Sequence, residues 1–194
     1  MPIDISSSTS LVALRSIEIP KWKRHAARLR SVPAPADVDA MIHAARSVRD
    51  AAAIEVLYSA GLRGCELREL TRDDIDLENA RINVRRGKGG KSRIVPIGAP
   101  AVVALRTLMN STRRTRLFTF SARTLRRIIA RTSRRMYSPH RLRHAFATHL
   151  LQNGAQLDEV RQLLGHAWLD TTQRYVHVES RDLAEVHARF HPRR

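Results

Sequence analysis

A tyrosine, two arginines, a lysine and two histidines stand out in this 194-residue sequence because of the chemistry they could perform together. They are Tyr175, Arg63, Arg143, Lys88, His140 and His166. A tyrosine phenol has a pKa near ~10 and attacks poorly at neutral pH without help. Two arginines can bind the non-bridging oxygens of a phosphate and neutralise a pentavalent transition state. A lysine can protonate a leaving oxygen, and a histidine can accept the phenol proton. The set therefore predicts attack of a tyrosine on a phosphodiester.

Each of these residues also has an ordinary structural explanation. A tyrosine at helical spacing more often packs in a core or an interface. Arg63 can cap a helix, and Lys88 can be the solvated tip of a turn. GKGGKS looks like a phosphate-binding loop, but an arginine stands where that motif needs its first glycine, so nucleotide hydrolysis is not expected. His140 and His144 are four residues apart without an intervening Glu or a third acidic ligand, so no metal site is expected.

The positive charge of the chain is concentrated in its central part. The sequence has 35 Lys and Arg against 18 Asp and Glu, a formal net charge of +17. Between Asn79 and Leu157 there are 18 Lys or Arg and no Asp or Glu. An arginine-rich proteome would explain the preference for Arg over Lys, but not the exclusion of acids from one stretch. We therefore expect a polyanionic partner, in the first place a nucleic acid.

Secretory and membrane proteins fit the sequence poorly. Its start, MPIDISSSTSLVAL, has no basic region and too short an apolar run for a signal peptide. No stretch approaches the ~20 apolar residues of a membrane span. Cys65 is the only cysteine, so no internal disulfide can form and a reducing cytosol fits. The sequence predicts a cytoplasmic protein that does not contact membranes.

The first candidate residues are expected on helices and a hairpin. In residues 36–61 apolar side chains recur at spacings of three and four residues. Asp37 is a candidate N-terminal cap of the helix, and Gly61 is a candidate residue for its end. This pattern predicts two helices or one broken helix that ends just before Arg63. Residues 81–97 alternate around a glycine-rich turn and predict a β-hairpin. Lys88 lies in that turn.

The clearest element of the sequence is the helix predicted in SPHRLRHAFATHLLQNG. Ser138 can cap it, Pro139 suits its first turn, and the Asn-Gly pair can end it. His140 and Arg143 then lie in the first turn on one face. Further along, Asp170 and Gln173 form a capping-box pattern, which puts Tyr175 in the first turns of another helix.

Two terminal segments flank the predicted core. Residues 1–35 carry Ser, Pro and the basic run KWKRHAARLR, and are predicted to be an arm or linker without a domain of their own. Residues 36–194 are predicted to form one α+β domain, mainly helical with a small antiparallel sheet. In residues 181–190 apolar residues recur at spacings of three and four residues, which predicts a short amphipathic helix. Such a helix must bury its stripe on its own domain or on a neighbour.

Taken in order, four segments resemble the catalytic domain of the tyrosine recombinases, the phage-integrase family, and look closest to the bacterial Xer recombinases. They are LYSAGLRGCELREL, RRGKGGKSRIVPIG, SPHRLRHAFATHLLQNGAQLDEVRQLLGH and TTQRYVHV. The resemblance extends over about residues 37–192. In this correspondence Arg63 matches the first catalytic arginine and Lys88 the hairpin lysine that acts as general acid. His140 and Arg143 match the H-x-L-R pair.

The resemblance also implies the reaction. His166 matches the second catalytic histidine and Tyr175 the nucleophile, which attacks a DNA phosphate to give a 3′-phosphotyrosyl link and a free 5′-hydroxyl. A 5′-hydroxyl of another strand then reverses the step, so no metal, ATP or other cofactor is implied. The partners implied are double-stranded DNA and, on paired sites, a homotetramer that exchanges its C-terminal helices. The free protein is expected to be a monomer.

Two features depart from the family pattern. Its members typically carry an N-terminal core-binding domain that closes a clamp around the duplex, whereas residues 1–35 stand in that place here. Residues 99–137 also look shorter than in Xer proteins and are rich in Arg. Small relatives of the fimbrial invertase type lack the extra domain too, and the chain could equally be an isolated catalytic half. Two further functions stay open: an inactive DNA-binding remnant and a type IB topoisomerase-like enzyme.

Overall fold

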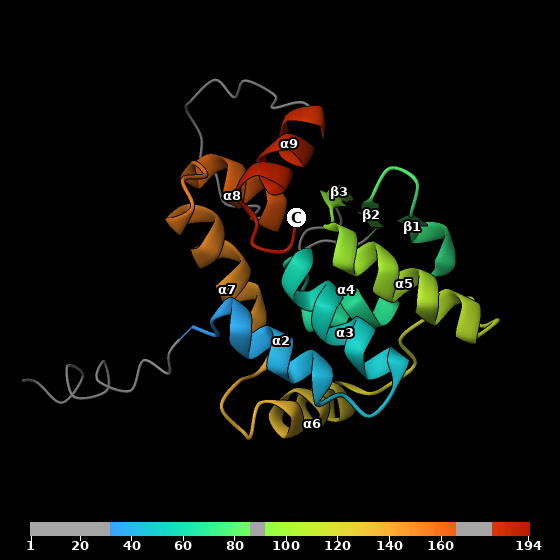
Figure 1. Ribbon diagram of the computed structural model, residues 1–194. Coiled ribbons are helices and arrows are strands. Elements are labelled where there is room, and N and C mark those ends of the chain that lie inside the picture. The colour runs from blue at the N-terminus through green and yellow to red at the C-terminus, as the bar shows by residue number, and fades with distance from the viewer. Residues whose placement is uncertain (1–31, 86–91, 166–179) are drawn as a thin grey trace, which may run out of the picture. The chain divides into compact units, whose positions relative to one another are not determined.

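The computed structural model describes residues 32–85, 92–165 and 180–194, which are coloured in Figure 1. Three of the candidate residues, Lys88, His166 and Tyr175, lie outside these ranges. The capping box predicted at Asp170 and Gln173 lies outside them as well, as does the arm up to residue 31. The fold and the site are therefore built from the remaining elements.

The described part of the chain is mainly helical, with one small sheet. Its elements, in order, are α2 (Pro35–His43), α3 (Val48–Ser59), α4 (Gly64–Glu69), the 3-10 helix η1 (Arg72–Asp74), β1 (Ile75–Asp76), β2 (Arg81–Val84), β3 (Arg93–Pro96), α5 (Ala99–Ser111), α6 (Ala122–Thr132), α7 (Pro139–Gln152), α8 (Leu157–Leu164) and α9 (Ser180–Phe190). The predicted α+β class, with a small antiparallel sheet, is confirmed.

Local capping decides where the first two helices begin. α2 begins two residues before Asp37, whose carboxylate accepts a hydrogen bond from the backbone N–H of Ala34 at 2.9 Å. The prediction of Asp37 as the cap residue is therefore wrong, since it lies in the first turn and reaches back to the cap. Ser47 caps α3 with its side chain, which breaks the pattern into two helices. Gly61 follows α3 with φ +57°, and a Cβ there would lie 2.5 Å from the Phe146 ring.

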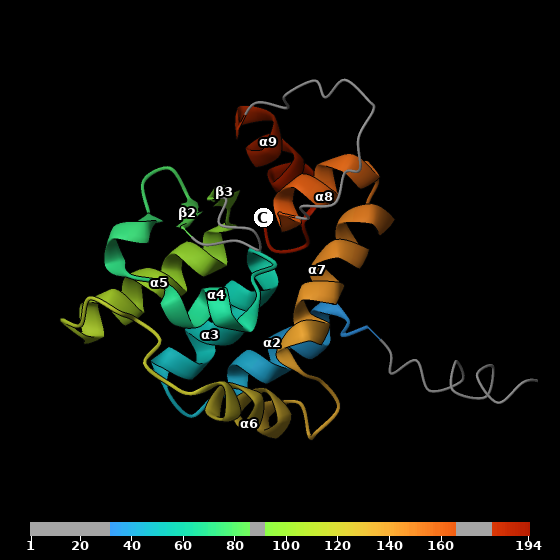
Figure 2. The ribbon, with the colours of Figure 1, turned by 180° about the vertical axis from the view of Figure 1, so that it is seen from behind.

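Helix α3 forms the centre of the core. It packs against α2, α5 and α7, and both views place it between them (Figures 1 and 2). Its residues from Ala52 to Ala60 are buried around the whole helix, as expected for a helix that is covered on all sides. Because α3 leads directly to Arg63, the packed core fixes the position from which that side chain projects.

The three strands form an antiparallel sheet in the order β1-β2-β3. Ile82 on β2 pairs with Val95 on β3, and both side chains are fully buried. Val84 pairs with Arg93, so the two strands of the predicted hairpin are present; buried and exposed residues alternate along β2, whereas Val95 and Pro96 are both buried on β3. The turn that carries Lys88 lies outside the described residues.

The C-terminal helix α9 packs on its own chain in this structure. It contacts β3, α7 and α8, as Figure 1 shows for the red helix. Val186 is buried on this surface, together with His187 and His191. The predicted amphipathic helix thus exists over Ser180–Phe190 and, in the isolated chain, buries its stripe on its own domain. None of the described helices is both long and apolar enough to cross a membrane.

Candidate active site

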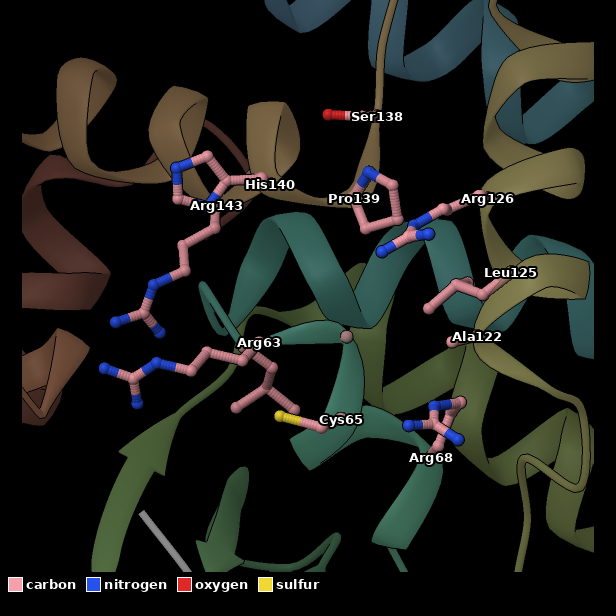
Figure 3. A pocket seen from close by; sticks show the side chains of 12 residues that line it. Arg63, Cys65, Arg68, Ala122, Leu125, Arg126, Ser138, Pro139, His140 and Arg143 are labelled. Carbon is pink, nitrogen blue, oxygen red and sulfur yellow. The ribbon is translucent and has the colours of Figure 1, made fainter. Parts of the chain in front are cut away.

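A pocket of about 590 Å³ opens where α4, α6 and α7 begin (Figure 3). Its lining is Leu62, Arg63, Gly64, Cys65, Arg68, Ala122, Leu125, Arg126, Ser138, Pro139, His140 and Arg143. Four of these side chains are arginines, and none is an Asp or a Glu. The pocket brings together the three sequence-predicted residues that the structure describes, namely Arg63, His140 and Arg143. Such a concentration of fixed positive charge suits a phosphate.

Arg143 is the most buried cation of the pocket. Its side chain is 7% exposed, and Nη1 and Nη2 donate to the carbonyl oxygens of Gly61 and Leu164 at 2.6 and 2.7 Å. Burial, followed by repulsion from Arg63, lowers the pKa of Arg143 to about 10. The guanidinium therefore remains positively charged at neutral pH. A guanidinium has five N–H donors, and these two bonds use two of them.

Arg63 lies at the junction between α3 and α4, and its side chain is half-buried. Its backbone N–H donates to Glu66 Oε2 at 2.7 Å, and its Nη1 donates to Glu66 Oε1 at 2.8 Å. Glu66 also links Arg63 to Arg143, because Glu66 Oε2 lies 3.9 Å from Arg143 Nη1. In Figure 3 the two guanidinium groups lie at the same end of the pocket.

Glu66 is the carboxylate that holds this end of the pocket together. Besides the bonds from Arg63, it accepts two parallel hydrogen bonds from Arg93, both at 2.9 Å. Burial alone would raise its pKa, but the hydrogen bonds from Arg93 and Arg63 outweigh it and hold the pKa of Glu66 at about 2. Neither Glu66 nor Arg93 was found from the sequence. For Glu66 a signal existed, since it follows Arg63 by three residues, whereas nothing local marks Arg93.

His140 lies in the first turn of α7, as predicted, whereas Arg143 is the fifth residue and begins the second turn. Ser138 occupies the position before the helix and Pro139 the first helical position, but the Ser138 side chain makes no capping hydrogen bond. His140 is exposed and lines the pocket, while Arg143 points inward. Within the described residues, no group of three or more His, Cys, Asp or Glu side chains is placed to hold a metal ion.

The C-terminal segment docks beside this site through polar contacts. His187 Nε2 donates to the carbonyl oxygen of Ser59 at 2.7 Å, just before the turn that leads to Arg63. Arg193 forms ion pairs with Glu55, at 2.6 Å, and with Asp39. Burial lowers the pKa of His187 to about 4, so this imidazole is neutral at physiological pH. Burial also raises the pKa of Glu55, despite the hydrogen bond from Arg193.

Comparison with known proteins gives this pocket its context. The model of the phage integrase family matches residues 34–181. The chain belongs to the phage integrase family. It is 44% identical over 161 residues to tyrosine recombinase XerC of Pelobacter propionicus. The aligned region covers 75% of this chain and 53% of that protein. The resemblance inferred from the sequence motifs is confirmed.

Solved structures of the family share the fold. The XerA recombinase is 32% identical with a TM-score of 0.62, covering 83% of this chain and 63% of that one. The XerH site-specific recombinase, bound to its difH substrate in a pre-cleavage complex, is 25% identical with a TM-score of 0.59, covering 79% of this chain and 52% of that one. The chain spans little more than half the length of the curated relatives it matches.

Proposed function

We propose that this chain is the catalytic part of a site-specific DNA recombinase, which cuts and rejoins DNA through a covalent 3′-phosphotyrosine intermediate. The observation that carries the proposal is the pocket in which Arg63, His140 and Arg143 converge without any lining carboxylate. Glu66 contacts Arg63, Arg93 and Arg143 from one side. A single negative charge among three positive ones leaves an excess that can stabilise a phosphate and its transition state.

The nucleophile in this proposal is Tyr175. The chain has three tyrosines, and the other two are buried: Tyr58 is fully buried and Tyr137 is 7% exposed. The Tyr58 hydroxyl shares a 2.7 Å hydrogen bond with His149, and the Tyr137 hydroxyl donates to Asp37 at 2.9 Å. Burial raises the pKa of Tyr58, which makes it a still poorer nucleophile. Neither buried phenol lines the pocket, which supports Tyr175.

In the proposed cleavage, one phosphorus–oxygen bond replaces another. The Tyr175 oxygen bonds to the phosphorus, and the bond from phosphorus to the 5′ oxygen breaks. A histidine, His140 or His166, accepts the phenol proton, and Lys88 gives a proton to the leaving oxygen. Arg63 and Arg143 neutralise the charge on the non-bridging oxygens in between. Attack by a 5′-hydroxyl on the phosphotyrosine reverses the sequence, and no metal or nucleotide cofactor takes part.

The proposed partner is double-stranded DNA. The stretch between Asn79 and Leu157 has 18 basic and no acidic residues, and its exposed basic side chains supply the charge for phosphate contacts. We also propose that residues 36–194 form the catalytic domain, that residues 1–35 are an arm, and that four copies assemble on paired sites by exchanging α9. The surface on which α9 docks supports this exchange. An identical neighbour presents the same Glu55, Ser59 and Asp39, so the C-terminal segment of one copy could make the same contacts on another copy.

The proposal is tested by covalent trapping on nicked duplex DNA carrying a candidate site. The wild-type protein should form a protein–DNA adduct that blocks the 3′ end. Arg63→Lys and Arg143→Lys should slow its formation by about 100-fold or more, because the single ammonium group cannot replace a guanidinium fork. Arg106→Lys, an exposed change on α5, is the matched control and should cleave like wild type. Absence of any adduct with the wild-type protein, or equal rates in all four proteins, contradicts the proposal.

A further inference from the structure

Arg93, the first residue of β3, links three parts of the chain that surround the candidate site. We infer that Arg93 is a positioning residue of the proposed reaction: it fixes the Glu66 carboxylate and, through it, the orientation of Arg63 and Arg143. The inference rests on the proposed function, because it assigns a role within that site. No local sequence signal marks this role, since Arg93 looks like an ordinary polar residue at the start of a strand.

The guanidinium of Arg93 is fully engaged by the protein. Its Nη1 and Nη2 donate to the two oxygens of Glu66 at 2.9 Å each, in a bidentate pair. Its Nε donates to the carbonyl oxygen of Leu163, at the end of α8, at 3.3 Å. The side chain is 11% exposed. Each nitrogen of Arg93 donates to the protein and, unlike Arg143, this residue does not line the pocket, so the role inferred for it acts through the groups it holds.

The bidentate pair fixes the plane of the Glu66 carboxylate. The terminal torsion of a glutamate is broad and roughly two-fold, so a carboxylate held by one bond can turn. Arg63 already donates to both oxygens, from its backbone N–H and its Nη1, and the two parallel bonds from Arg93 further restrict this rotation. The orientation matters because each Glu66 oxygen also meets a second partner. Oε1 accepts a hydrogen bond from Arg63 Nη1, whereas Oε2 accepts one from the backbone N–H of Arg63 and faces Arg143. Turning the carboxylate would disturb both arginines of the pocket.

Arg93 and Arg143 also hold the same end of α8. Arg93 donates to the carbonyl of Leu163 and Arg143 to the carbonyl of Leu164, two groups that a helix end leaves without intrahelical partners. The next residue, Gly165, has φ +62°, and a Cβ there would lie 2.7 Å from Arg93 Cδ. A glycine is therefore needed both for the backbone conformation and for the close approach of Arg93.

The place of Arg93 in the chain extends this link. Gly165 is followed directly by His166, α4 follows directly after Arg63, and Lys88 precedes Arg93 by five residues. One guanidinium thus ties together the chain segments that lead into most of the candidate catalytic residues. An ion pair placed only for stability would not need this location, and buried ion pairs contribute little net stability compared with well-packed apolar residues.

A matched ion pair elsewhere in the fold provides the control. Arg131 on α6 donates to Asp50 on α3 at 2.9 Å, and the Asp50 side chain is 8% exposed. This pair also joins two elements through a buried carboxylate, but neither residue lines the pocket. Removing Arg131 should therefore reproduce the structural cost of a lost arginine without the proposed loss of positioning.

The test compares Arg93→Lys, Arg93→Gln and Arg131→Gln with the wild-type protein. Single-turnover adduct formation on nicked duplex DNA, DNA affinity and thermal midpoint are measured for each. We expect Arg93→Lys to cleave about tenfold and Arg93→Gln about 100-fold more slowly, with DNA affinity within about threefold of wild type. Arg131→Gln should cleave within about twofold of wild type at a comparable loss in thermal midpoint. The Arg93→Gln/Glu66→Gln double variant should be no slower than Glu66→Gln alone.

The inference would be overturned if both Arg93 variants cleaved at the rate of Arg131→Gln. It would also be overturned if the rate losses of Arg93→Gln and Glu66→Gln multiplied in the double variant. If Arg93→Gln does not fold, Arg93→Lys decides the matter. A wild-type protein that forms no adduct refutes the proposed function, and the positioning role is then judged by NMR. The Nε–Hε resonances of Arg63 and Arg143 should shift in Arg93→Lys and stay in place in Arg131→Gln. Unchanged resonances in Arg93→Lys would count against the role.

Discussion

Replacing Glu66 by glutamine tests how the pocket is held together, because it removes one charge and almost no volume. In the wild-type protein the carboxylate accepts hydrogen bonds from Arg63 and Arg93. A glutamine side chain has one acceptor oxygen and an NH₂ group that faces a guanidinium donor, so Arg93 loses half of its bidentate partner. The charge balance of the buried cluster changes at the same time, which destabilises the folded state.

The size of this effect depends on pH in a defined direction. The pKa of Glu66 is lowered from 4.5 to about 2 in the folded protein. Because the pKa of Glu66 is lower in the folded state than in the unfolded state, the ionised carboxylate stabilises the folded protein. This stabilisation is fully present above the unfolded-state pKa, and it is lost as the pH falls from there to the folded-state pKa. The shift corresponds to about 3 kcal/mol at neutral pH. About 2 kcal/mol of this is lost between pH 6 and pH 3.

Urea unfolding of the wild-type and Glu66→Gln proteins at pH 6, 5, 4 and 3 measures the effect. The difference in the free energy of unfolding between the two proteins should shrink by about 2 kcal/mol over this range. Other carboxylates titrate in both proteins and cancel in the difference. Glu69→Gln, an exposed change on the same helix, is the control and should differ from wild type by less than about 0.5 kcal/mol throughout. A Glu66→Gln difference that stays constant with pH would refute the reasoning.

DNA contact and the docking of the C-terminal segment are each open to a direct measurement. Adduct formation should continue at the same rate in excess EDTA, while DNA affinity should fall at least about tenfold between 50 and 200 mM salt; loss of cleavage with binding intact would point to a metal instead. Arg193→Ala leaves the buried Glu55 without its cation and should cost about 3 kcal/mol in urea unfolding, whereas wild-type stability would show that the ion pair is dispensable. Gly98→Ala places a Cβ against the carbonyl oxygen of Arg193, so limited trypsin digestion should release the C-terminal residues faster than from wild type. An unchanged rate would contradict this.

Several elements could be predicted because their signals are local. In α7 the proline and the apolar spacing act within a few residues, and the helix starts where they indicate, although the Ser138 side chain makes no capping hydrogen bond. Alternation and glycines marked the hairpin, and its two strands pair antiparallel as a hairpin requires. The error at Asp37 is also local in origin: an acidic residue near a helix start can be the cap or lie in the first turn, and the sequence does not separate the two.

The remaining features depend on contacts between distant residues. Arg93 meets Glu66 across 27 positions, and no spacing rule connects a strand residue with a helix residue at that distance. His187 and His191 have polar side chains, which favour exposure, yet both are buried where α9 docks, and His187 contacts Ser59 of α3. The amphipathic stripe of α9 predicted that this helix must dock, but not on which surface. Only the packed fold supplies that answer for the isolated chain.

Mapping of the covalent adduct decides whether Tyr175 is the residue that bonds to DNA. Wild-type protein and Tyr175→Phe are incubated with a nicked site, digested, and analysed by mass spectrometry for a nucleotide-linked peptide. Wild type should carry the nucleotide on Tyr175, and Tyr175→Phe should form no adduct while binding DNA within about threefold of wild type, since one hydroxyl seldom carries much affinity. An adduct that persists in Tyr175→Phe, or that maps to Tyr58 or Tyr137, would contradict the account.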